Sequence, residues 1–213
     1  MASIRPEAQY ATLEQQTETA QLGMWAFLAT EVLFFGALIF GYYIYRIAYT
    51  DQFILAGHDA KLVLGSINTA LLLTSSVTMV AAIELIKRNE ARRAATALYL
   101  TALLGIAFLG VKGYEYLQDY YDHTVPVLDF VLKPHQQPPV ELFWLFYFVA
   151  TGLHALHLTI GIVAVLILAA HTRSGRYSAA YHSPIEVLGL YWSFVDVVWL
   201  FLFAAIYPIG HAG

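Results

Sequence analysis

The chain has 213 residues, of which 59% are hydrophobic and only 12% are charged, and its formal net charge is −4. Its mean hydropathy of +0.61 lies well above that of a soluble globular domain, so the composition indicates an integral membrane protein. The sequence contains no cysteine, which excludes a thiolate copper centre, an iron–sulfur cluster and covalently attached haem on this chain.

The sequence predicts an all-α fold, an integral membrane bundle of five transmembrane helices. A polar segment, residues 1–21, comes first and lacks the basic start and apolar centre of a cleavable signal. Residues 22–207 then form one transmembrane domain, and 208–213 form a short tail. Its five apolar runs cover about 22–47, 62–86, 94–118, 141–170 and 184–207. Each run can cross roughly 30 Å of hydrocarbon at about 1.5 Å per residue.

The distribution of Lys and Arg near the span ends predicts the orientation. One side carries seven of these residues: Arg5, Lys87, Arg88, Arg92, Arg93, Arg173 and Arg176. The other side has only Arg46, Lys61 and Lys133. Because cytoplasmic loops are enriched in Lys and Arg, we expect the N-terminus inside and the C-terminus outside.

Three ionisable residues lie near the middle of three different predicted spans. They are Glu31 in the first span, His154 in the fourth and Asp196 in the fifth. Each costs on the order of 2.5–3.5 kcal/mol at a helix centre, so we expect the three side chains to face a common interior and to satisfy one another. In so apolar a setting Glu31 is expected to be a neutral acid unless a cation or donor is close. The sequence leaves two roles open for the three residues: interhelical hydrogen bonds that hold the helices together, and proton handling.

The stretch "TGLHALH" places His154 and His157 three residues apart, a spacing that could present two imidazoles to a metal. No further ligand set is visible, and a haem held between two histidines would draw them from facing helices. We therefore expect both histidines to bond a carboxylate or a main-chain carbonyl, and we predict no metal ligand.

Three further polar residues are read as structural. Lys112 and Glu115 are three apart near the outer end of the third span, which predicts an ion pair within the helix at the membrane interface. In the second span, Asn68 lies beside a stripe of small residues that would let another helix approach closely. The stripe consists of Ser66, Ala70, Thr74 and Thr78.

Five motifs now resemble one family. "ATEVLFF", "INTALLL", "GYEY", "TGLHALHLTIG" and "YWSFVDVVWLFLF" occur one per span, in the order found in subunit III of the haem-copper terminal oxidases. The resemblance covers residues 22–207 and is closest to the short five-helix bacterial form of cytochrome c oxidase subunit III.

The resemblance implies a redox-inactive accessory subunit in the bacterial inner membrane, with no catalytic residue and no cofactor of its own. Its partners would be subunits I and II, with haem and copper held there, and membrane lipids, with phospholipid bound. No nucleic acid is expected. Glu31 matches the family acid that reacts with a hydrophobic carbodiimide, and the family's subunit is credited with supporting proton uptake and protecting the catalytic subunit.

The resemblance leaves the electron donor open. "FVDVVWLFLF" is most similar to the branch that uses cytochrome c, whereas quinol oxidases and the accessory subunit of nitric oxide reductase systems share the motifs. Two readings from other classes are a proton-coupled transporter using Glu31 and Asp196, and a haem-binding electron carrier. Five unbroken spans argue against the transporter, because such folds use inverted repeats and broken helices. The lack of facing histidines argues against the carrier.

Overall fold

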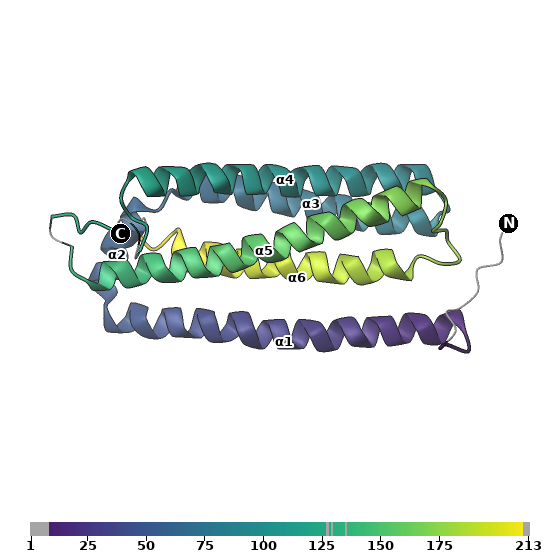
Figure 1. Ribbon diagram of the computed structural model, residues 1–213, viewed down its shortest axis with the longest axis horizontal. Coiled ribbons are helices and arrows are strands. Elements are labelled where there is room, and N and C mark those ends of the chain that lie inside the picture. The colour runs from purple at the N-terminus through teal and green to yellow at the C-terminus, as the bar shows by residue number, and fades with distance from the viewer. Residues whose placement is uncertain (1–8, 127, 129, 135, 211–213) are drawn as a thin grey trace.

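The computed structural model describes residues 9–126, 128, 130–134 and 136–210. This part of the chain contains six helices: α1 (Leu13–Ala48), α2 (Thr50–Asp59), α3 (Leu62–Lys87), α4 (Ala91–Tyr121), α5 (Pro139–Arg173) and α6 (Ser183–Ile206). All except α2 are long and apolar enough to cross a membrane. The five long helices run side by side in an elongated bundle, and α1 begins at the end opposite to that where α6 finishes (Figure 1). The predicted all-α fold with five spans is confirmed.

The helix α1 begins nine residues before the predicted first span. Its start is set by Thr12, whose hydroxyl oxygen accepts a hydrogen bond from the Gln15 amide at 3.1 Å. The Gln15 side chain in turn accepts a hydrogen bond from the main-chain amide of Ala11, the residue before the cap, at 3.0 Å. Residues 13–21 of the expected polar segment are therefore helical, while residues 1–8 and 211–213 lie outside the described chain.

The short helix α2 is absent from the sequence prediction. Its buried residues Phe53, Ala56 and Gly57 recur at the i, i+3, i+4 spacing of one helix face, which packs against α5. At ten residues α2 is too short to span a membrane, so a search for long apolar runs misses it.

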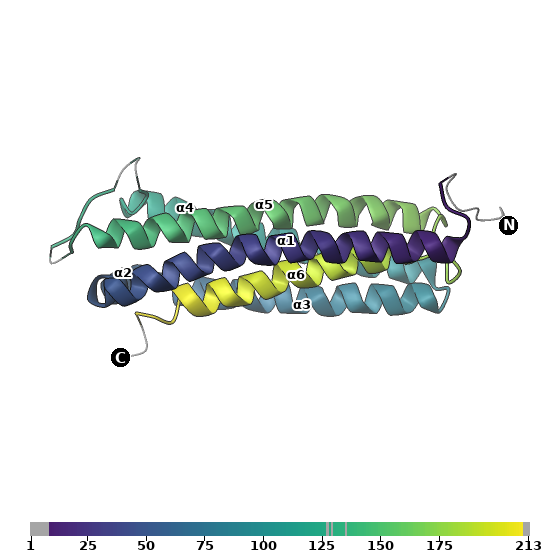
Figure 2. The same ribbon diagram turned by 90° about the horizontal axis from the view of Figure 1, so that it is seen from below.

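The helices are packed unequally. The pair α3 and α4 is joined by a short turn, α5 and α6 pack against this pair, and α1 lies at the side against α5 and α6 (Figure 2). In the most apolar part of each helix, 50% of the residues of α6 are buried but only 11% of those of α1. Only three residues of α1 are buried, Leu28, Phe35 and Tyr42, and they are seven residues apart. A single narrow seam therefore holds α1 to the bundle.

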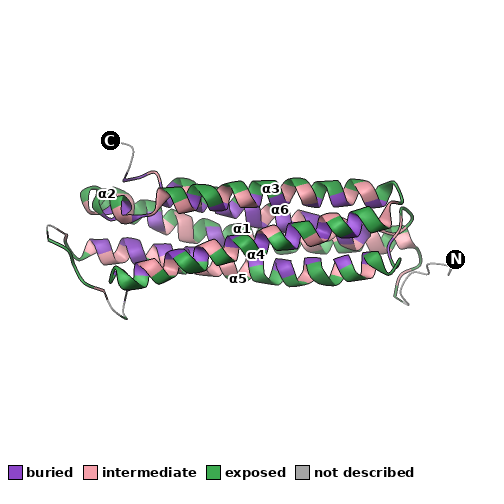
Figure 3. Cartoon of the chain, turned by 90° about the horizontal axis from the view of Figure 1, so that it is seen from above, coloured by how far each residue is buried: buried purple, intermediate pink, exposed green. Residues whose placement is uncertain are grey.

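The outer surface of the bundle is apolar. Each long helix carries both buried and exposed residues along its length (Figure 3). Large apolar side chains such as Leu33, Ile47 and Val63 are more than 70% exposed, as expected where lipid or another membrane subunit covers the helices. Three of the four members of the small-residue stripe of α3 face outward, and the fourth, Thr78, contacts Thr101 of α4 at 2.7 Å between the hydroxyl oxygens.

The two ends of the bundle differ in charge. The connection between α3 and α4 and that between α5 and α6 lie at the end where α1 begins, and the remaining connections lie at the other end (Figure 1). The Lys and Arg residues that the sequence analysis groups on one side, as far as they are described, therefore do share one end of the structure.

Candidate functional site

Glu31 meets His157, and not His154, across the seam between α1 and α5. The Nε2 atom of His157 lies 3.1 Å from Oε2 of Glu31, and its Nδ1 lies 2.8 Å from the main-chain carbonyl oxygen of Leu153. Because a carbonyl can only accept, Nδ1 must carry a hydrogen. The contact between Nε2 and Glu31 then holds one proton, located on either the acid or the imidazole. The pair is therefore a proton-sharing pair about midway along the length of the bundle.

Three helices position this pair. The ring of Phe35 on α1 packs edge-on against His157 at 5.3 Å between ring centroids. From α6, the hydroxyl of Tyr191 donates to the main-chain oxygen of His157 at 2.9 Å. The side chains of Glu31 and His157 remain 18% and 15% exposed, so the pair lies at the edge of the bundle and is accessible from its outer face.

His154 faces the core of the bundle. Its ring packs against Phe108 and Trp199, with centroids 5.5 and 5.2 Å away, and neither ring nitrogen has a hydrogen-bond partner among the described residues. The predicted grouping of Glu31, His154 and Asp196 is therefore wrong. Side chains three residues apart on an α-helix point in directions that differ by about 60°. His157 therefore faces α1, whereas His154 faces the core.

Asp196 instead belongs to the seam between α3 and α6. Its Oδ2 accepts a hydrogen bond from the hydroxyl of Ser76. On the same two helices, the indole nitrogens of Trp192 and Trp199 donate to Ser75 and Thr69 at 3.1 and 3.0 Å. These contacts fasten α6 to α3.

Asn68 is fully buried on α3, within the packed part of the bundle. Its side-chain amide has no hydrogen-bond partner among the described residues. Its predicted structural role therefore rests on its position alone, since no contact with a partner supports it.

The predicted ion pair of Lys112 and Glu115 is present, with 3.1 Å between Nζ and Oε2, and it lies in the interior of the bundle. The two side chains are only 3% and 1% exposed, since α5 and the segment after α6 cover them. The pair is part of a larger polar cluster with Asp119, which lies on the same face of α4 seven residues after Lys112. The sequence carried this signal in the spacing of the three residues.

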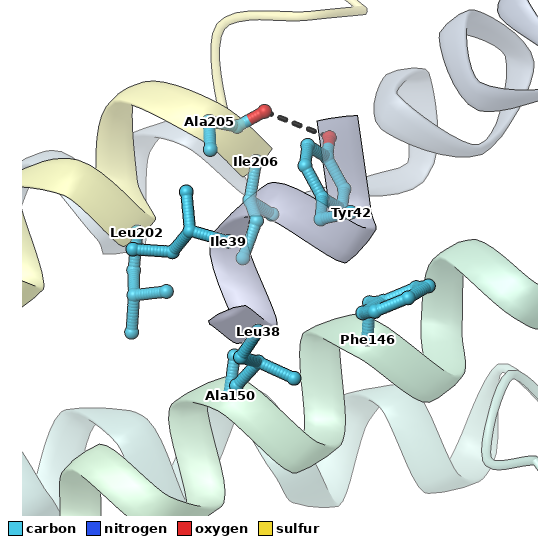
Figure 4. A pocket seen from close by; sticks show the side chains of 8 residues that line it. All are labelled: Leu38, Ile39, Tyr42, Phe146, Ala150, Leu202, Ala205 and Ile206. Carbon is cyan, nitrogen blue, oxygen red and sulfur yellow. Dashed lines mark hydrogen bonds between the residues drawn. The ribbon is translucent and has the colours of Figure 1, made fainter. Parts of the chain in front are cut away.

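The described residues form no cluster of metal ligands, and the cavity beside α1 is too small for a substrate. None of their His, Asp and Glu side chains gather in a group of three or more that could hold a metal ion. A cavity of about 10 Å³ lies between α1, α5 and α6, lined by apolar side chains and Tyr42 (Figure 4). It is about the size of one water molecule. The Tyr42 hydroxyl already donates to the Ala205 carbonyl at 2.8 Å, so the cavity offers no polar group for a substrate.

The family is decided by comparison with known proteins. The cytochrome c oxidase subunit III family matches residues 4–211. The chain belongs to this family. It is 33% identical over 187 residues to cytochrome c oxidase subunit 3 of Thermostichus vulcanus, spanning 87% of this chain and 85% of that protein.

Two further relatives match over more of their length. Cytochrome c oxidase subunit 3 of Alkalihalophilus pseudofirmus is 32% identical over 203 residues, which is 95% of this chain and 92% of the relative. Quinol oxidase subunit 3 of Bacillus subtilis is 30% identical over 206 residues, which is 95% of both chains. The resemblance found from the five motifs is confirmed, and the chain is a multi-pass membrane subunit of the haem-copper oxidase class.

Proposed function

We propose that this subunit supports proton uptake by the catalytic subunit of a respiratory oxidase in a bacterial inner membrane, and that it carries no cofactor itself. The observation that supports this proposal is the Glu31–His157 pair, which holds one proton at an accessible edge of the bundle. Subunits I and II are the partners that hold the haem and copper.

The subunit acts through position and charge. In one state of the pair Glu31 is neutral and donates to His157, and in the other an imidazolium faces a carboxylate. Both states have zero net charge, so the proton moves between the two side chains without placing an uncompensated charge in lipid. A pair of this kind can respond to a charge change in a neighbouring subunit.

Phospholipid is the proposed ligand of a groove between α1, α5 and α6. The groove has a volume of about 470 Å³ and is lined mainly by apolar residues, including Met24, Ile167 and Leu188. Tyr181 and Ser183 line its polar end, and Arg173 and Arg176 lie in the same part of the chain. An acyl chain fits the apolar part, and the hydroxyl groups of Tyr181 and Ser183 can donate hydrogen bonds to the oxygens of a headgroup. An intact complex in which mass spectrometry detects no retained phospholipid would contradict this assignment.

Cytochrome c is the proposed donor to the complex, since the first two relatives above are cytochrome c oxidase subunits. The B. subtilis relative, a quinol oxidase subunit with 95% coverage, supports quinol as the alternative. Oxygen consumption by the purified complex distinguishes them: reduction by quinol but not by cytochrome c would establish the alternative.

The change Glu31→Gln tests the role of the pair. Gln keeps the size of the side chain, and its amide can still donate to Nε2 of His157, but it cannot release a proton. We expect proton uptake by the assembled oxidase to slow about fivefold or more, at the lower end of typical coupling between linked sites, and activity to be lost sooner during turnover.

The matched control is Glu84→Gln, which alters an exposed glutamate of α3 that pairs with Arg88 at 2.9 Å. This variant should behave as wild type in turnover, proton uptake and loss of activity with time. If Glu31→Gln also behaves as wild type in all three, Glu31 only holds α1 to α5 and the proposal fails.

A further inference from the structure

A second polar cluster lies in the bundle at the end where α4 finishes, away from Glu31. Three of its members, Lys112, Glu115 and Asp119, follow one face of α4. Tyr147 of α5 and Tyr207, directly after α6, complete its interior. All five residues are at most 2% exposed, so every polar contact among them must be made without bulk water.

Lys112 uses all three of its hydrogens inside the cluster. Its Nζ lies 3.1 Å from Oε2 of Glu115, 2.9 Å from the Tyr147 hydroxyl oxygen and 2.7 Å from the Tyr207 hydroxyl oxygen. An ammonium group has three donors and no acceptor, so it has none left for another partner.

The two phenols have fewer hydrogens than their contacts need. Tyr207 donates its only hydrogen to Oε1 of Glu115 at 2.8 Å. The Tyr147 oxygen lies 2.9 Å from Oε1 of Glu115 and also 2.9 Å from Oδ2 of Asp119. One phenolic hydrogen cannot serve both carboxylates. The cluster thus has six contacts between described residues and five hydrogens from Lys112, Tyr147 and Tyr207.

Two further charged residues, Lys61 and Asp122, adjoin the cluster. Lys61 contacts Asp119 at 2.9 Å, and it also contacts Asp122 at 3.2 Å. Burial lowers the pKa of Lys61, but hydrogen bonds and charge from Asp119 and Asp122 raise it by more, so its pKa lies above its ordinary value of 10.5. The cations of Lys61 and Lys112 balance the buried carboxylates of Glu115 and Asp119, and Asp122, whose side chain is 54% exposed, adds one negative charge at the water-facing edge. One added proton therefore leaves the whole group, Asp122 included, with zero net charge.

The remaining titratable groups that face the cluster do not supply this hydrogen. Tyr116, whose ring lies 5.1 Å from Nζ of Lys112, shares its hydroxyl hydrogen bond with Thr151 at 2.6 Å. His154 is separated from Lys112 by Trp199, whose ring both residues contact.

We propose that Glu115 and Asp119, bridged by the Tyr147 hydroxyl, bind one exchangeable proton. In the loaded state the Asp119 acid donates to the Tyr147 oxygen, and Tyr147 donates to Glu115, so that all six contacts contain a hydrogen. The proton comes from water at this end of the bundle by way of Asp122, whose side chain is 54% exposed, and Lys61. On release the proton returns to water, and Asp119 becomes a carboxylate paired with Lys61.

This site is independent of the Glu31–His157 pair and of the electron donor. It is tested by infrared difference spectra of the whole oxidase complex in lipid, recorded between about pH 5 and about pH 9. We expect a carbonyl band of a protonated carboxylic acid that disappears as the pH rises and shifts when carboxyl-13C aspartate or glutamate is incorporated.

The variants Asp119→Asn and Glu115→Gln should each lose this band. In Asp119→Asn the new side-chain amide can donate to Tyr147 and mimics the loaded state, which favours correct folding. The control Asp59→Asn alters an acid at the same end that pairs with Lys133 at 2.9 Å, outside the cluster, and should keep the band. If the band persists at full intensity in both variants, or is absent from the wild type throughout the range, the proposal is overturned. Should Asp119→Asn not assemble, Tyr147→Phe decides in its place, since loss of the bridge must also abolish or shift the band.

Discussion

A main-chain carbonyl determines which nitrogen of His157 carries a hydrogen. Leu153 accepts from Nδ1, which leaves Nε2 to share a proton with Glu31. The sequence indicated that Glu31 requires a polar partner, because an isolated acid in a span is costly. Choosing between two histidines one turn apart required the crossing of α1 over α5, which no local pattern encodes.

The two histidines should differ in their contribution to stability. His157→Leu removes the partner of Glu31, and we expect it to lower the free energy of unfolding by about 1–3 kcal/mol, because a half-buried acid in an apolar setting loses its hydrogen bond. His154→Leu removes a side chain without such a bond among the described residues, so we expect an effect within about 1 kcal/mol or a stabilisation. Denaturant titration of the detergent-solubilised subunit measures both, and a larger loss for His154→Leu would contradict this assignment.

At the scale of helices, α3 packs against α4 on one side and against α6 and Tyr207 on the other. The close approach of α3 to Tyr207, at the end where α3 begins, depends on Gly65. A Cβ atom built there would lie 2.7 Å from the ring of Tyr207, a fully buried side chain whose hydroxyl is bonded to Lys112 and Glu115. Small residues let helices in membranes approach this closely.

We therefore expect Gly65→Ala to destabilise the bundle by about 1–3 kcal/mol, because the ring of Tyr207 must move and overpacking strains the core. The matched change Gly110→Ala places the same methyl group on α4 where nothing lies within 4 Å. That variant should be neutral or slightly stabilising, since Ala favours a helix more than Gly does. Thermal unfolding in detergent compares the two variants. Equal shifts of the unfolding temperature would show that the contact with Tyr207 does not make Gly65→Ala destabilising.

At the scale of the whole molecule, the connections gather at two ends that differ in basic charge, and the predicted orientation follows from this difference. The seam of α1 leaves most of that helix for lipid or a partner subunit. The proton-sharing pair lies on this seam, whereas the polar cluster around Lys112 lies beneath α5 and Tyr207. The pair therefore faces lipid or a partner subunit, whereas the cluster reaches water through Lys61 and Asp122.

The orientation can be measured because the chain contains no cysteine. Single changes Ser174→Cys and Asp51→Cys place a thiol at exposed positions on opposite ends of the bundle. In intact cells a membrane-impermeant maleimide should label the second and spare the first, and in inverted vesicles the pattern should be reversed. Labelling of Ser174→Cys in intact cells would show that the N-terminus faces outward.

The membrane class, the five spans and the family could all be predicted from the sequence. These follow from apolar run length and from motifs read along one chain, which are local properties. The folded bundle was needed to see that His157 is the partner of Glu31, that Asp196 bonds to Ser76, and that Lys112 is buried in a cluster. Those contacts depend on the rotation and crossing of helices that are far apart in the sequence, and a rotation of about 60° is enough to exchange one partner for another.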